Sequence, residues 1–206
     1  SPGTNTYGAR VLDFGSNTNL IDLHDIRIRH GDKCIAVSGA NVTLSHSQIS
    51  KSAYAFWLTP VSFKLRNVLV HDVSTAFNYP STNYCENVTF HRIGTFKSSN
   101  SDRVVFLTNS LVISVTNNLV FQGANNYTNL TDTGIFQTVG AATHYLASGS
   151  TNRDAGTTNI NATLLADLKK RTTYPHVVLT AAITNDTTLT AQAQRDTDTP
   201  DLGYHL

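Results

Sequence analysis

Five polar residues could act on one ligand, because their types suit acid–base chemistry and the capture of a negative charge. They are His46, His71, Asp72, His91 and Arg92. A His beside an Asp can serve as a general base, and an Arg can clamp a carboxylate. We expect His46, His71, His91 and Arg92 to bind ligand; no catalytic residue is assigned, and His71, Asp72 and Arg92 are the candidates. The alternative is a solvated outer face whose side chains hydrogen-bond to one another.

Trp57 is the only tryptophan, and the alternation of its strand predicts that it points outward. When the copies of the repeat are aligned, three tyrosines occupy positions near Trp57: Tyr54, Tyr79 and Tyr84. An exposed aromatic face suits the apolar face of a sugar ring, so Trp57 is a further candidate for ligand binding. In the alternative, the loop around Thr59-Pro60-Val61 folds over Trp57 and buries it.

The carboxylates near the C-terminus are spaced somewhat like those of a Ca²⁺ loop. Asp196, Asp198 and Asp201 lack the Gly of the sharp turn and the distal Glu that an EF-hand loop uses. A network of Asx turns around Pro200 is the preferred interpretation. We therefore expect no metal site and no cofactor, with Ca²⁺ as the alternative.

Short strands in a two-part repeat must position these residues. The first part is an Asn or Asp followed by apolar residues at alternate positions, at residues 25–28, 41–44, 67–70, 87–90 and 118–121. The second part begins at residues 34, 55 and 76. Two strands in a period of roughly 20 residues are typical of a stacked solenoid, in which neighbouring coils bury each other's apolar faces.

Aligning the copies of the repeat predicts which side chains form the core. In the first part, Val42, Val68 and Val88 form one inward column, and in the second part Phe56 and Phe77 form another. Adjacent coils stack ~4.8 Å apart. The five polar candidates are then expected to lie together in one outer stripe.

The repeat resembles the right-handed parallel β-helix of pectate-lyase-like proteins. The resemblance rests on the Asn-Val-Thr-Leu-Ser of residues 41–45 and the Asn-Val-Thr-Phe-His of residues 87–91, and extends over roughly residues 10–150. It implies an all-β fold, a right-handed parallel β-helix solenoid. It leaves activity open, because this fold hosts lyases, hydrolases, adhesins and inert stalks.

The C-terminal third resembles the closing segment of secreted bacterial β-helix proteins. The matching stretches are Gly-Ser-Thr-Asn-Arg-Asp-Ala-Gly at residues 149–156 and Asp-Thr-Asp-Thr-Pro-Asp-Leu-Gly-Tyr at residues 196–204. Thr151 departs from the Pro of that pattern. The resemblance implies a secreted or surface bacterial protein and no particular chemistry.

A third stretch is similar to polygalacturonase-type glycoside hydrolases. Residues 31–37, Gly-Asp-Lys-Cys-Ile-Ala-Val, correspond to the Gly-Asp-Asp-Cys-Ile-Ala of that family, but Lys33 stands in place of the second Asp. An inverting hydrolase needs two carboxyl groups, and the Gly-His-Gly and Arg-x-Lys of the family do not follow. We therefore interpret this stretch as a strand of the solenoid.

The remaining chain divides into two expected regions. Parallel β-helix coils are expected over residues 1–146, and a C-terminal capping segment over residues 147–206. One helix is expected at residues 162–171, with Asn161 as its cap. Two strands are expected before it and two after it: Gly134–Val139, His144–Ala147, Val177–Ala181 and Thr187–Ala191.

Composition restricts the partners. Charged residues are 14% of the 206 residues and the net charge is +1, so no nucleic-acid partner is expected. No apolar run approaches the ~18 residues of a membrane span. The protein is expected to be a monomer.

Cys34 and Cys85 are expected at different corners of the coil, which disfavours a disulfide. The abundance of Thr, Asn and Ser favours a secreted or cell-surface protein, and Ser1-Pro2-Gly3 is interpreted as the start of a processed chain or a fragment.

These features favour a β-helix protein that engages a polysaccharide or another extracellular partner along one solenoid face. The main alternative is a polysaccharide lyase or glycoside hydrolase acting on uronate-type glycans. The second alternative is a structural stalk or adhesin segment. Glycan binding needs an exposed Trp57, a lyase needs a basic residue that faces a cleft, and a stalk needs neither.

Overall fold

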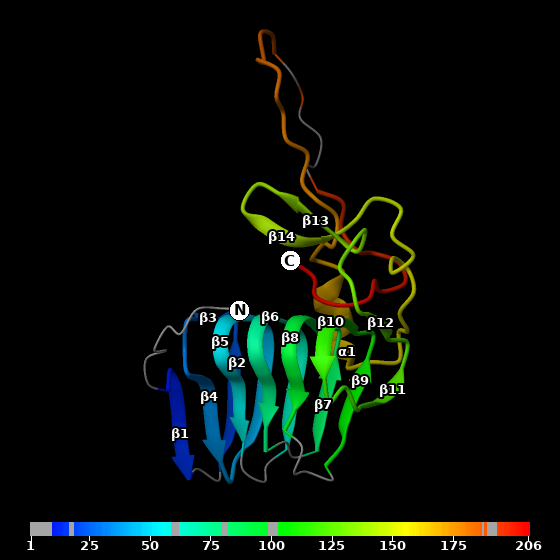
Figure 1. Cartoon of the computed structure of the whole chain (residues 1–206). Coiled ribbons are helices and arrows are strands. Elements are labelled where there is room, and N and C mark those ends of the chain that lie inside the picture. The colour runs from blue at the N-terminus through cyan, green and yellow to red at the C-terminus, as the bar shows by residue number, and fades with distance from the viewer. Residues whose placement is uncertain are drawn as a thin grey trace.

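The chain winds into a parallel β-solenoid of about four turns, in which strands make up 51% of the structure. The structure is a computed structural model and describes residues 10–16, 19–58, 62–79, 82–98, 103–186, 188 and 193–206. Figure 1 shows the strands of successive coils side by side, from β1 at one end to β11 at the other. The expected all-β solenoid with one short helix near the C-terminus is confirmed.

Three faces form each coil, and every strand pair within them is parallel. The first face consists of β2 (Leu20–His24), the starts of β5 (Asn41–Leu58) and β6 (Phe63–Asn78), β7 (Asn83–Glu86), β9 (Val105–Thr108) and β11 (Gln122–Ala124). The second face consists of β3 (Arg27–Arg29), the middles of β5 and β6, the starts of β8 (Thr89–Lys97) and β10 (Leu111–Asn117), and β12 (Tyr127–Asn129). The third face consists of β1 (Leu12–Ser16), β4 (Lys33–Ser38) and the ends of β5, β6, β8 and β10.

Residues with a left-handed backbone turn the chain from face to face. The first corner, between the first and second faces, contains Asp25, His46, Asn67, Asn87, Asn109 and Asn125, and the second corner, between the second and third faces, contains His30, Lys51, Asp72, Arg92 and Ser114. Their φ angles lie between 51° and 61°. Asn and Asp adopt this region readily because their short side chains bond to nearby backbone, which explains why they recur in the repeat.

The core is built from side chains that alternate inward along each strand. Phe56 and Phe77 are fully buried, and their rings stack with centroids 5.2 Å apart. Phe77 also contacts Phe90 and Phe96 in the next coil, at 5.7 Å and 5.6 Å. The expected burial is observed throughout, in a single core cluster that includes Val42, Phe56, Val68, Phe77 and Val88.

The phase assigned to two copies of the repeat is wrong: the copies at residues 41–44 and 118–121 follow the third face, whereas the other three begin at the first corner. Val42 pairs with Phe63 on the first face, whereas Val68 pairs with Ser47 on the second. Val42 and Val68 therefore belong to different inward columns. Both faces follow the same alternation of apolar and polar residues, so the pattern alone does not distinguish them.

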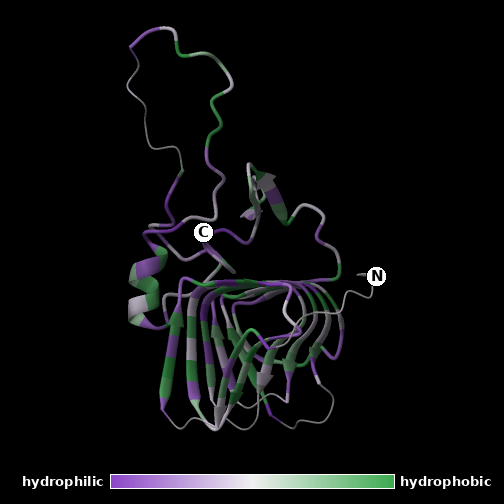
Figure 2. Cartoon of the chain, turned by 90° about the vertical axis from the view of Figure 1, so that its left-hand side faces the viewer, coloured by the Kyte–Doolittle hydropathy of each residue, from purple (hydrophilic) through white to green (hydrophobic). Residues whose placement is uncertain are grey.

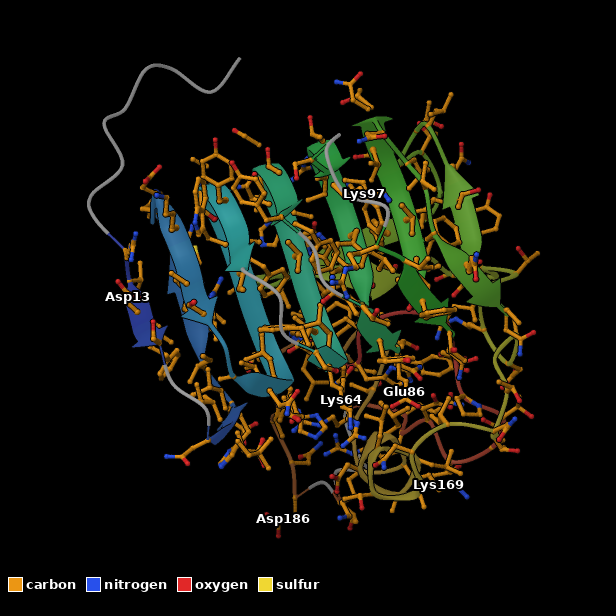
Figure 3. The ribbon with its side chains drawn as sticks, turned by 90° about the horizontal axis from the view of Figure 1, so that it is seen from below. Asp13, Lys64, Glu86, Lys97, Lys169 and Asp186 are labelled. Atoms are coloured by element: carbon orange, nitrogen blue, oxygen red, sulfur yellow. The ribbon has the colours of Figure 1, made fainter. Side chains whose placement is uncertain are left out.

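A hairpin and the C-terminal segment cover part of the solenoid from outside. β13 (Phe136–Val139) and β14 (Ala142–Leu146) form a separate antiparallel sheet, which Figure 1 shows above the coils. Helix α1 (Ala162–Leu168) is capped by the Asn161 side chain as expected and ends three residues earlier than expected. Figure 3 shows α1 near Glu86, whose carboxylate accepts a hydrogen bond from the Asn161 backbone at 2.9 Å.

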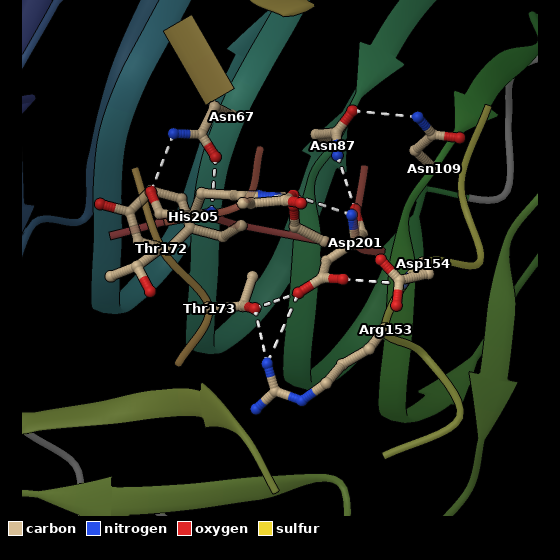
Figure 4. A network of polar contacts seen from close by, with 12 residues as sticks. Asn67, Asn87, Asn109, Arg153, Asp154, Thr172, Thr173, Asp201 and His205 are labelled. Atoms are coloured by element: carbon tan, nitrogen blue, oxygen red, sulfur yellow. Dashed lines mark hydrogen bonds and ion pairs between the residues drawn. The ribbon is translucent and has the colours of Figure 1, made fainter. Parts of the chain in front are cut away.

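The C-terminal residues run along the first corner, where buried Asn side chains hold them. Asn67 exchanges two hydrogen bonds with the backbone of His205, at 2.7 Å and 2.9 Å. Asn87 donates to the carbonyl of Asp201, and Asn109 exchanges two bonds with Thr157. Figure 4 shows these three Asn side chains in a row facing the tail. We call the residues that make these contacts, Thr157 and residues 201–206, the C-terminal strap, because they span several coils from the side.

The expected strand Val177–Ala181 does not form. Residues 177–186 are exposed and carry no strand, and Figure 2 shows this part of the chain projecting away from the solenoid. A strand needs a hydrogen-bonded neighbour, and none lies beside this stretch among the described residues. The expected strand Thr187–Ala191 falls mostly outside the described residues.

The two cysteines lie on different faces. Cys34 and Cys85 are both buried and both free, on the third and first faces respectively. As for membrane spans, no helix within the described parts of the chain has the length and apolar character to cross a bilayer.

Candidate functional site

A cavity of about 880 Å³ lies between the second face and the β13–β14 hairpin. Its floor is formed by outward side chains of the second face and by residues of the second corner. Its roof is formed by the hairpin and the loop before it, from Asp132 to His144, and Leu206 lines it as well. We call this cavity the groove. Its size lies within the range of small-molecule sites.

Positive side chains predominate among the charged residues of the groove. Arg27, Arg29, Lys51 and Arg92 line it, and all four are exposed. The side-chain carboxylates that line it are those of Asp72 and Asp132. With neutral histidines the lining side chains therefore carry a net charge of +2, although the side chains of the whole chain sum to only +1. It favours a negatively charged ligand.

Three of the candidate residues form one hydrogen-bonded unit at the second corner. His71 Nδ1 lies 2.8 Å from Asp72 Oδ2, and Arg92 Nε lies 2.6 Å from Asp72 Oδ1. The hydrogen bond from His71, together with Arg92, lowers the pKa of Asp72 far below its usual value. Asp72 is therefore ionised, and it orients His71 with its Nδ1–H toward the carboxylate. This leaves the Nε2 lone pair of His71 available as a base.

A second chain of hydrogen bonds joins the floor to the roof. His91 Nε2 lies 3.0 Å from Asp132 Oδ2, His91 Nδ1 lies 2.9 Å from His144 Nε2, and His144 Nδ1 lies 2.8 Å from the Thr143 hydroxyl. The acceptor-only Asp132 assigns the proton of His91 to Nε2, so His91 Nδ1 accepts from His144. His91 and His144 are both neutral in this arrangement.

Burial keeps these two histidines neutral. Desolvation lowers the pKa of His144 to about 3, with further contributions from His71, His91 and Arg92. Desolvation also lowers the pKa of His91, against the opposing effect of Asp132. His144 lies between the other two rings, with centroids 4.7 Å from His71 and 5.1 Å from His91. The inner end of the groove thus contains two packed, neutral imidazoles, His91 and His144, which we call the imidazole cluster.

The backbone at the second corner is unusual for the residues it carries. Lys51 and Arg92 have φ angles of 53°, a region that costs about 1–2 kcal/mol for a residue with a Cβ and without a short polar side chain. Gly, Asn or Asp would adopt this conformation more easily. At this corner the left-handed backbone, which turns the chain between faces, also places the charged side chains of Lys51 and Arg92 on the wall of the cavity.

The structure brings together four of the five residues expected in one polar stripe. His71 and His91 are register partners, and Asp72 and Arg92 follow them at the second corner. His46 instead occupies the first corner, where it contacts Asn67 at 3.2 Å and Asp167 at 3.5 Å. The expected place of His46 in this stripe is wrong because it depended on the misassigned phase of the Asn41 copy: the register partner of His71 in the preceding coil is Ser50.

Trp57 lies on the third face, away from the groove. Its side chain is half-buried, with Lys33 Nζ 3.7 Å from the centre of one ring face. Tyr54 and Tyr79 contact the indole edge-on, at centroid distances of 4.9 Å and 5.7 Å. The loop around Thr59-Pro60-Val61, which was expected to decide its burial, lies outside the described residues. Trp57 and the histidines do not share one groove.

Several groove residues were not predicted from the sequence: Arg27, Arg29, Lys51, Asp132 and His144. The position of Lys51 beside Asp72 could have been predicted, because Lys51 precedes Asp72 by one period of the repeat. Asp132 and His144 belong to the hairpin region, and nothing in their local sequence indicates where the hairpin docks.

A separate group of carboxylates lies in the C-terminal segment. Oxygens of Asp154, Asp196 and Asp198 lie within 4.8 Å of one another, so they could approach a single cation. This trio differs from the one suggested by spacing, because Asp201 accepts hydrogen bonds from the Asp154 backbone and the Thr173 hydroxyl instead. Burial and the neighbouring carboxylates raise the pKa of Asp154.

Comparison with known proteins leaves the fold and the groove as the guides to function. No protein-family model, no curated protein and no solved structure matches this chain. Function must therefore be inferred from the residues that line the groove.

Proposed function

We propose that this solenoid protein binds an acidic polysaccharide in the groove between its second face and the β13–β14 hairpin. The observation that carries the proposal is the presence of four exposed cations around one cavity in a chain whose net charge is only +1. Both carboxylates of the groove already have cationic or imidazole partners. The groove side chains that remain available to pair with a charged ligand are therefore mainly positive.

The neutral part of the groove suits a sugar. Phe136 is partly exposed and packs against the buried rings of His91 and His144, with ring centroids 4.9 Å and 5.1 Å away, so Phe136 presents apolar ring surface to the groove. Aromatic surface beside hydrogen-bonding groups is typical of sites that bind pyranose rings. A secreted or cell-surface location is part of this proposal, and the low charge and the Thr, Asn and Ser content support it.

Binding to glycans matched in length and different in charge tests the proposal. We expect polygalacturonate to bind and a neutral galactan to bind weakly, with the affinity for polygalacturonate falling as salt increases. Arg29→Gln should weaken binding up to about fivefold, the effect of one exposed ion pair. Lys64→Gln, which removes an exposed cation from the first face, is the matched control and should change nothing.

Equal binding of neutral and acidic glycans would contradict the cationic groove. Failure to bind any glycan at millimolar concentration would support the structural stalk or adhesin segment instead. Trp57→Ala provides an internal comparison, because Trp57 lies on another face. If Trp57→Ala weakens binding more than Arg29→Gln does, the site is on the third face.

The His71–Asp72 pair supports a second candidate, a lyase for uronate-type glycans. The Nε2 of His71 could remove the proton next to the uronate carboxylate, while Arg92 neutralises that carboxylate. The C4–O bond then breaks as a C4–C5 double bond forms, and the leaving oxygen takes a proton. Hydrolysis fits less well, because Asp72 and Asp132 both have lowered pKa values and a general acid must carry a proton.

Product chemistry distinguishes binding from elimination. A lyase would release unsaturated ends that absorb ultraviolet light, and His71→Gln would abolish their formation while preserving binding. If wild-type protein binds polygalacturonate without forming such ends, the protein is a binding module for this glycan.

A further inference from the structure

We infer that the groove accepts the end of an acidic glycan chain and excludes an internal stretch of the chain. This inference rests on the proposed function and concerns how the ligand enters. It follows from three barriers around the inner end of the groove.

The first barrier is an apolar cluster beyond the last coil that lines the groove. Floor residues extend as far as Arg92, and among the described residues none of β10 or β12 contributes to the lining. There the outward side chains Leu111 and Ile113 pack against Ile135 and Leu146 of the hairpin region, and all four are buried. The hairpin therefore rests directly on the solenoid and blocks passage along its axis.

The second barrier is the C-terminal strap on the side of the first corner. The Tyr204 hydroxyl accepts a hydrogen bond from Gln48 at 3.1 Å, and the Tyr204 backbone donates to Thr89 at 2.9 Å. Tyr204 is buried, and Leu206 lines the groove next to it. A chain cannot leave across this side without displacing the strap.

The third barrier is a bridge from roof to floor near the second corner. Asp132 Oδ2 lies 3.0 Å from His91 Nε2 and 3.6 Å from Arg92 Nη1. These contacts link the loop before β13 to β8 at the second corner, next to the imidazole cluster. The inner end is thus blocked along the axis and on both sides.

The groove opens toward the earlier coils, where Arg27, Arg29 and Lys51 lie. In this geometry the terminal sugar lies against the neutral cluster of His91, His144 and Phe136. The carboxylates of the following sugars lie among the cations at the mouth. The cations at the mouth therefore match the carboxylates of an acidic chain that extends outward from its terminal sugar.

The test measures how much protein polygalacturonate binds when its mean chain length is varied at constant mass. Recognition of a chain end predicts that halving the mean length doubles the protein bound at saturation, because the number of ends doubles. Binding to internal stretches predicts that the capacity stays constant, and this result would overturn the inference. Failure to bind at any length would instead remove the proposed function.

Competition provides a second readout. Trigalacturonate should displace the protein from the polymer with a potency per molecule close to that of the polymer, since each offers the same ends. A polymer that is more potent per molecule in proportion to its length would overturn the inference. Arg29→Gln should lower the affinity for both ligands, and Lys64→Gln should leave both unchanged, which assigns the effect to the groove.

Discussion

Single residues determine both the shape of each coil and the chemistry of the groove. At the first corner, Asn side chains combine a tolerated left-handed backbone with hydrogen bonds to the C-terminal strap. At the second corner, the same left-handed backbone occurs at Lys51, Asp72 and Arg92, and their charged side chains line the groove. The same turn geometry therefore holds the C-terminal strap at one corner and presents charged side chains to the groove at the other.

Phe77 links the aromatic contacts of neighbouring coils and should be among the most sensitive sites of the core. Its ring contacts Phe56, Phe90 and Phe96, and its side chain is fully buried. Phe77→Ala should lower the free energy of unfolding by about 3–5 kcal/mol, because it leaves a cavity between coils. Tyr84→Ala, at a side chain that is 47% exposed, is the control for urea unfolding. A similar loss in both variants would contradict the role of the stack.

The imidazole cluster should make the protein sensitive to mild acid. His144 has a pKa of about 3 when folded, below the ordinary value of 6.5, so the folded state binds fewer protons than the unfolded state. Its contribution is complete above pH 6.5 and is lost as the pH falls toward 3. At pH 5 the loss should be about 2 kcal/mol of unfolding free energy.

Urea unfolding at neutral pH and at pH 5 measures this loss. His144→Gln removes the titrating group and should reduce the difference in stability between the two pH values. His24→Gln, at an exposed His of the first face, should retain the full difference. An unchanged pH dependence in His144→Gln would assign the acid sensitivity to other groups.

At the level of elements, the C-terminal strap contributes stability that no single coil has alone. It contacts successive coils through Asn67, Asn87 and Asn109 and covers Leu111 and Ile113 with Leu202. Coils of a solenoid contact only their neighbours, so a segment that spans several coils couples them.

Asn67 allows the two roles of a corner Asn to be separated. Asn67→Gly keeps a residue that tolerates a φ of 52° but loses both hydrogen bonds to His205, which should cost about 1–3 kcal/mol. Asn67→Ala loses the same bonds and adds backbone strain of about 1–2 kcal/mol. Urea unfolding should therefore rank wild type above Gly and Gly above Ala. Equal stability of the two variants would show that the backbone strain is relieved by local rearrangement.

For the whole molecule, stability should decrease toward the N-terminal coil. Among the described strands β1 pairs with β4 alone, whereas β6 pairs on both sides and carries the aromatic stack and the strap contact of Asn67. Partial opening is expected where buried contacts are fewest.

Hydrogen exchange should reveal this gradient. Backbone amides of β1 and β2 should exchange faster than those of β6 and β8, and the difference should persist under conditions where global unfolding is rare. Uniform protection along the solenoid would indicate a single cooperative unit instead.

Much of the fold could be predicted from the sequence. Alternating apolar residues with recurring Asn and Asp predicted the solenoid and the burial of Phe56, Phe77 and Val88, because burial within a coil depends on local alternation. The same alternation occurs on all three faces. The sequence therefore did not determine which face the Asn41 copy occupies, and His46 was placed with the wrong neighbours.

The site depended on contacts between segments far apart in the chain. The sequence determined that His71, Asp72, His91 and Arg92 recur one period apart, and stacking then brings them together. Only the tertiary structure placed His144 and Asp132 over them, since the docking of a hairpin depends on packing against a distant surface. Local pattern determined the coils; the position of the hairpin and the strap, and with it the groove, was decided by long-range packing.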